Sequence, residues 1–173
     1  MRLEETAYHE AGHAVAAYWM GVRLKLASIK RLGSSLGRVK HVPPFRGLKL
    51  SLKHNSIMSR VRLENAVIIV LAGHGALRRF NPRIRDRSGR LDDYKQAIYC
   101  LSFFSGSSRE TEAYLRWLEI RTEEILKQKQ VWNAVKALAQ TLIEKKTLKG
   151  PEAEKIIEDA FADASKPVKE KQG

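Results

Sequence analysis

The chain has 173 residues, with 32 Lys and Arg against 19 Asp and Glu for a formal net charge of +13, and 43% of it is hydrophobic. A chain of this size buries about 70% of the surface that its unfolded form exposes, so a globular core is expected and disordered or collagen-like classes are excluded. The single cysteine, Cys100, excludes an intrachain disulfide and a multi-cysteine metal site, and we expect it to be buried and unreactive.

The hydrophobic pattern predicts a mainly helical chain. Apolar residues at helical spacing over residues 3–20 stop at Gly21, and Ser56 is placed to cap a helix that continues through the apolar stretch 67–77. The remaining helices are expected over residues 91–104, 110–128, 132–145 and 151–164.

A period-two alternation over residues 24–31, followed by a second short run at 38–42, predicts a β-hairpin. Pro43 and Pro44 are expected to close it before a loop at 45–55. The predicted fold class is therefore α+β, mainly α, with a small hairpin or short sheet beside the first helix. We expect one domain over residues 1–164 and a flexible basic tail over 165–173.

The positive charge is concentrated in residues 1–93, which hold 18 Lys and Arg against 7 Asp and Glu. Such a balance suits nucleic acid, an anionic membrane or acidic substrates, but no nucleic-acid recognition motif accompanies it, so we expect no nucleic-acid partner. The longest uncharged stretch, 65–77, is shorter than the roughly 20 residues of a membrane span. The first residues do not form a signal peptide, and we expect a cytoplasmic protein.

The chemistry is concentrated in the first predicted helix, where His9, Glu10 and His13 form an HExxH motif. Residues four apart lie on one helical face, so the two imidazoles can bind one zinc ion (Zn²⁺). Glu10 is displaced around the helix from His9, which places its carboxylate to accept a proton from water at the metal. The spacing predicts a catalytic zinc site with Glu10 as the general base.

A third protein ligand must come from another segment. Asp92 and Asp93 begin a predicted helix and are the best pair, although the helix dipole favours acidic residues there in any case. Glu64 or Glu110 are alternatives, and spacing alone does not decide among the four. The other histidines are isolated in the sequence and are expected to be ordinary polar residues: His41, His54 and His74.

The motif and its flanks resemble the zinc helix of the peptidase domain of FtsH-type ATP-dependent zinc metalloproteases. The resemblance extends in order to about residue 160, and the matching segments are Thr6-Ala7-Tyr8-His9-Glu10-Ala11-Gly12-His13-Ala14-Val15, Ser28-Ile29-Lys30-Arg31 with Leu36-Gly37, Leu71-Ala72-Gly73, Ser88-Gly89 with Asp92-Asp93, and Leu142-Ile143-Glu144-Lys145-Lys146-Thr147-Leu148-Lys149-Gly150.

The resemblance implies a zincin-like peptidase domain in which Asp93 is the third zinc ligand and Asp92 occupies the family's asparagine position. It also implies that an extended polypeptide substrate adds as a strand to a β edge near the zinc, within residues 24–31. The substrate-binding residues expected on that edge are Leu26, Ala27, Ser28, Ile29 and Lys30.

Two departures from the family bear on function. No Gly-x-x-x-x-Gly-Lys-Ser/Thr loop occurs, so the chain has no ATPase of its own, and Leu77 stands where the family has a glutamate. The expected function is zinc-dependent endopeptidase action on unfolded or flexible polypeptides, with a separate ATPase or unfoldase as a candidate partner. The alternative is a catalytically silent zinc-binding regulator or interaction protein. The sequence leaves the oligomeric state open.

Overall fold

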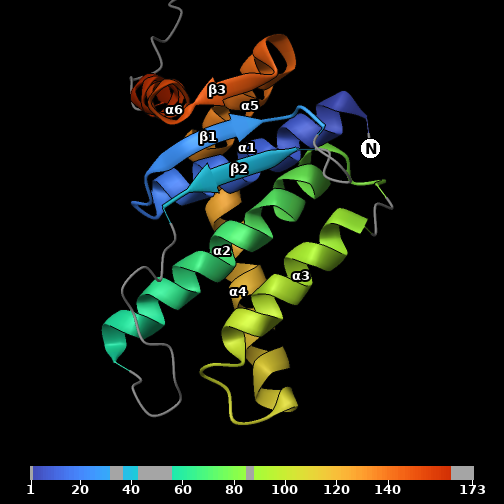
Figure 1. Cartoon of the computed structure of the whole chain (residues 1–173), viewed down its shortest axis with the longest axis vertical. Helices are drawn as coiled ribbons and strands as arrows, with labels where there is room; N and C mark the ends of the chain where they lie inside the picture. The colour runs from blue at the N-terminus through green and yellow to red at the C-terminus, as the bar shows by residue number, and fades with distance from the viewer. Residues whose placement is uncertain (1, 32–36, 43–55, 85–87, 165–173) are drawn as a thin grey trace, which may run out of the picture.

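The computed structural model describes residues 2–31, 37–42, 56–84 and 88–164 (Figure 1). This part of the chain confirms the mainly helical fold class with a small sheet. The elements in chain order are α1 (Leu3–Trp19), β1 (Leu24–Ser28), β2 (Arg38–His41), α2 (Ile57–Phe80), α3 (Ser88–Leu101), α4 (Ser108–Lys127), α5 (Lys129–Lys145), β3 (Thr147–Lys149) and α6 (Gly150–Ala164).

Local chemistry fixes where the two central helices begin. The backbone N–H of Arg2 donates to the Glu5 carboxylate at 2.7 Å, which satisfies one of the groups left open at the start of α1. Ser56 caps α2, since its hydroxyl accepts from the Ser59 N–H at 3.1 Å, as the sequence predicts. After α1 the chain turns at Gly21, whose φ of 70° lies in the left-handed region that glycine adopts readily.

The packing of α1 against α2 forms the centre of the core, and α5 covers another side of α1. Gly12 of α1 lies so close to α2 that an added Cβ would meet the Ala72 carbonyl oxygen and come within 2.6 Å of the Ala76 Cβ. The helices α2 and α3 lie side by side (Figure 1). In the portion that the structure describes, no helix has both the length and the apolar character needed to cross a membrane.

The three strands form an antiparallel sheet in the order β2-β1-β3. The predicted pairing of β1 with the run at 38–42 is confirmed, whereas β3 was not predicted. The expected turn at Pro43 and Pro44, the loop at 45–55 and the tail at 165–173 lie outside the described residues.

The expectation that β1 forms an open edge for substrate is wrong. The strand lies in the middle of the sheet, with Ala27 paired to Val39 of β2 on one side and to Leu148 of β3 on the other. Its backbone groups are therefore already used for pairing. The correction applies to all five residues expected there, because the Ile29 N–H donates to Lys146 and the Lys30 N–H to the Ser28 hydroxyl: Leu26, Ala27, Ser28, Ile29 and Lys30.

The close approach of α1 and α2 makes Gly12→Ala a test of the fold. We expect the substitution to lower the free energy of unfolding by about 1–3 kcal/mol, because the methyl group overpacks a tight helix contact. Urea denaturation followed by circular dichroism measures the change. Gly106→Ala is the control, since its Cβ would come no closer than 3.4 Å to the nearest side chain; equal stability of the two variants would contradict the packing argument.

Candidate metal centre

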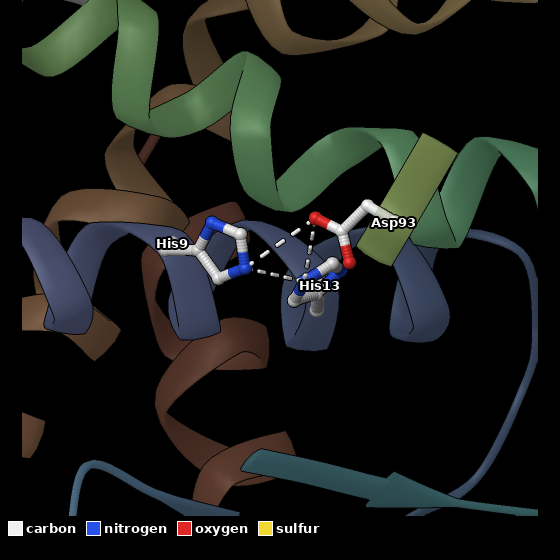
Figure 2. A group of neighbouring side chains, drawn as sticks. All are labelled: His9, His13 and Asp93. Carbon is white, nitrogen blue, oxygen red and sulfur yellow. Dashed lines mark hydrogen bonds and ion pairs between the residues drawn. The ribbon is translucent and has the colours of Figure 1, made fainter. Parts of the chain in front are cut away.

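Two histidines of α1 meet at one point beside α2 (Figure 2). The Nε2 atoms of His9 and His13 are 3.0 Å apart, and the ring centroids are 4.6 Å apart at an interplanar angle of 85°. The four-residue separation within an uninterrupted helix places both rings on the same face, as the sequence predicts. His9 is buried and His13 is half-buried, so the pair lies at the edge of the core.

Asp93 reaches the same point from α3 (Figure 2). Its Oδ2 atom lies 3.5 Å from His9 Nε2 and 3.8 Å from His13 Nε2. Two ligand atoms that a tetrahedral zinc ion holds at about 2.0–2.1 Å are about 3.4 Å apart. The three distances between the Nε2 and Oδ2 atoms, 3.0, 3.5 and 3.8 Å, lie on both sides of this value. These three residues are also the only group of such side chains, within the described residues, whose ligand atoms all lie within 4.8 Å of one another.

The hydrogen bonding of these side chains fits a shared cation. His13 Nδ1 lies 2.8 Å from the Ile69 carbonyl oxygen, and the tautomer that donates this bond leaves a lone pair on Nε2. The Oδ2 atom of Asp93 is buried and has no hydrogen-bond donor among the groups that the structure describes. A buried carboxylate oxygen facing two imidazole nitrogens is stabilised by a positive ion, so the group can hold a metal.

The other acidic candidates for the third ligand lie elsewhere. Asp92 is exposed to solvent, although it is adjacent to Asp93 in the chain. Glu64 accepts a hydrogen bond from the Tyr114 hydroxyl, and Glu110 accepts one from the Gly106 N–H at 2.7 Å. The geometry therefore favours Asp93 over the three alternatives that the spacing left open.

Two glycines leave room for the side chains of the site. An added Cβ at Gly73 of α2 would collide with the His13 ring, and one at Gly37 would lie 2.6 Å from Glu10 Oε1. Gly37 directly precedes β2, so the Glu10 carboxyl lies where that strand begins. The sequence gives no signal for either contact, because both depend on segments that are distant along the chain.

Burial shifts the ionisation of two of the candidate ligands, His9 and Asp93, toward their neutral forms. Desolvation, reinforced by the charges of His13 and His74, holds the pKa of His9 well below its ordinary value. Desolvation also raises the pKa of Asp93; the His13 charge opposes this rise and the Asp92 charge adds to it. A neutral His9 is the form that binds a metal, so the protein environment favours ligation by this imidazole.

Glu10 is a buried carboxyl group with a pKa near neutrality. Desolvation is the largest cause and raises its pKa to about 7, while the His13 charge lowers it and the Asp93 charge raises it. A carboxyl that titrates near pH 7 can both accept and donate a proton under physiological conditions. Glu10 is not part of the three-residue metal group, which agrees with the role expected from the motif.

The other histidines, Cys100 and Leu77 lie outside the three-residue metal group. His41 lies in β2 with its Nδ1 2.9 Å from the Val42 carbonyl, and His54 lies outside the described residues. His74 is buried on α2 and acts electrostatically on His9, a proximity that the sequence did not indicate. Cys100 is buried, as predicted, and burial raises the pKa of its thiol. Leu77 is buried in the core.

Comparison with models of known protein families finds no match for the chain, and a search of curated proteins finds none either. The site is therefore defined by its own geometry.

The ligand assignment predicts the metal content of two neighbouring variants. Asp93→Ala should weaken zinc binding by at least about 10-fold, because loss of a direct ligand costs no less than loss of an outer-shell partner. Asp92→Ala should keep the zinc of the parent chain, since this side chain is exposed. Equilibrium dialysis followed by metal analysis measures both; retention by Asp93→Ala with loss by Asp92→Ala would mean that the ligand is the adjacent residue.

The burial of Glu10 predicts a pH-dependent stability of the metal-free chain. With a pKa of about 7 when folded and near 4.5 when unfolded, its carboxyl favours the folded state below pH 4.5, and this contribution is lost as the pH rises through 7. Glu10→Gln removes this titration. The free energy of unfolding of the variant, relative to that of the parent chain, should therefore rise by about 3 kcal/mol from pH 4.5 to pH 8. Urea unfolding in the presence of a chelator, repeated across this range, measures the difference. A parallel pH dependence of the two proteins would contradict the assignment.

Proposed function

We propose that the chain is a zinc-dependent endopeptidase that hydrolyses peptide bonds in unfolded or flexible polypeptides. The observation that supports it most directly is the convergence of His9, His13 and Asp93 with a buried, near-neutral carboxyl at Glu10. Three protein ligands leave a tetrahedral ion one further position, which is the arrangement of catalytic rather than structural zinc sites. The resemblance of residues 6–15 to the FtsH zinc helix supports the same activity and a zincin-like fold.

Glu10 is the proton carrier in the proposed reaction. When bound, zinc would polarise the scissile carbonyl and increase the acidity of a nearby water molecule. The Glu10 carboxylate accepts the proton of the attacking water and then donates it to the nitrogen of the leaving amine, so one group serves as base and acid in turn. His13 is held in orientation by its bond to the Ile69 carbonyl, which fixes the ring toward Asp93.

We place the proposed substrate site at the edge of β2 that does not pair with β1, and no longer at β1. The described sheet ends at this strand, and the Glu10 carboxyl lies at its first residues beside Gly37. A polypeptide that adds to β2 as a further strand would pass this carboxyl and gain main-chain hydrogen bonds with little demand on its sequence. Only an extended segment can bind in this way, which is why the substrate is proposed to be unfolded or flexible.

The absence of a nucleotide-binding loop in the 173 residues shapes the proposed partners. These residues alone therefore do not unfold a substrate by ATP hydrolysis, and a separate unfoldase is proposed to supply folded proteins as extended segments. A cytoplasmic location and the lack of a nucleic-acid partner stay part of the proposal.

A catalytically silent zinc-binding protein is the second candidate. It is favoured by Leu77, which is buried in the core where the resembling family has a glutamate. A leucine there supports packing but offers no hydrogen bond to the site. The two candidates share the metal group and differ only in turnover, so an activity measurement separates them.

Digestion of an unfolded substrate tests the peptidase proposal. The zinc-loaded chain is expected to cleave casein, and Glu10→Gln should be slower by about 100-fold or more, as loss of a general acid or base typically costs 10²–10⁴-fold. Because Glu10 is not in the metal group, the variant should bind as much zinc as the parent, which must be measured in the same preparations.

Two controls complete the test. Chelation should abolish cleavage and added zinc should restore it, and a stable folded protein should resist digestion. Equal rates for the parent and Glu10→Gln, or no cleavage by either despite full zinc loading, would reject the peptidase and leave the silent zinc-binding protein.

A further inference from the structure

A pocket of about 560 Å³ lies between α2, α3 and α4, and we name it the α2–α4 pocket. Its buried apolar lining includes Leu71 and Leu126, and its exposed cations include Arg78, Arg116 and Lys127. The volume lies in the usual range of small-ligand sites, about 300–1,000 Å³. None of the three candidate metal ligands lines it, so it is a separate site.

The α2–α4 pocket has an excess of positive charge. Four cationic side chains line it against two acidic ones, Glu119 and Glu123. Arg116 pairs with Glu119 at 3.3 Å, and Lys127 pairs with Glu124 at 2.7 Å. Arg78 has no carboxylate partner among the residues that the structure describes, so the charge that remains for a ligand is concentrated on α2.

A second arginine of the pocket is held in place by neighbouring groups. Arg79 donates to the Leu126 carbonyl oxygen, and its guanidinium lies 4.3 Å from the centre of the Trp132 ring. The Tyr94 hydroxyl donates a hydrogen bond to the Glu119 carboxylate, which also pairs with Arg116. Fixed cations bind an anion with less loss of side-chain freedom than mobile ones.

We propose that the α2–α4 pocket binds a carboxylate carried on an apolar group, with Arg78 as its principal charged contact. The planar guanidinium matches the two oxygens of a carboxylate, and the leucine lining accepts an aliphatic or aromatic body. The C-terminus of a polypeptide with an apolar last residue and a small carboxylic acid share this chemistry. The inference goes beyond the proposed peptidase activity and does not depend on it.

Calorimetric titration of the 173-residue chain carrying Glu10→Gln tests the proposal without hydrolysis of the probe. The probes are a short peptide that ends in leucine with a free carboxylate, the same peptide amidated at its C-terminus, and hexanoate. The free acid that binds should lose at least 10-fold in affinity when Arg78→Glu is added to the chain. The matched control is Arg121→Glu, an exposed arginine of α4 outside the pocket, which should leave the affinity unchanged.

Each outcome decides the matter. Tight binding of the free peptide with at least 10-fold weaker binding of its amide supports a polypeptide C-terminus, and binding of hexanoate alone, sensitive to Arg78→Glu, supports a small acid. The proposal is overturned if neither acid binds, if the amide binds as well as the acid, or if both charge reversals have the same effect. Circular dichroism confirms that Arg78→Glu folds, and Arg78→Gln serves as a milder second variant.

Discussion

The contact between α1 and α2 is the constraint on which the candidate centre depends. Gly12 brings the two helix backbones together, and Gly73 opens the space that the His13 ring occupies. The same approach lets His13 Nδ1 reach the Ile69 carbonyl at 2.8 Å, which orients the ring toward Asp93. A larger residue at either glycine would separate the helices or displace the imidazole. The packing of α1 on α2 therefore determines the position of the candidate ligand His13.

Electrostatics at the centre oppose the folded state unless a cation is present. Glu10 and Asp93 are two carboxyl groups taken out of water near each other, and burial raises the pKa of both. A bound metal ion would offset this cost, because any ligand that binds only the native chain stabilises it by mass action. The chain therefore retains a locally unfavourable arrangement of two buried carboxyl groups.

The sequence predicts the local parts of the structure and misses the distant ones. The two histidines are correctly placed on one helical face because their geometry is set within four residues. Spacing could not choose between Asp92 and Asp93, since adjacent helical positions differ by about 100° and only the docking of α3 determines which one faces α1. The pattern over 24–31 does not predict the central position of β1 for a similar reason, because its second partner, β3, comes from the distant residues 147–149.

The candidate metal centre and the α2–α4 pocket are lined by neighbouring residues of the same two helices, α2 and α3. On α2, Gly73 backs the His13 ring while the next residue, His74, lines the pocket; on α3, Asp93 reaches the histidines while Tyr94 lines the pocket. Consecutive residues of a helix point in directions about 100° apart, so one helix can serve two sites without sharing a side chain. A ligand in the pocket would touch the residues that follow Gly73 and Asp93, so a shift of α2 would move the groups that support His13, and a shift of α3 would move the third candidate ligand.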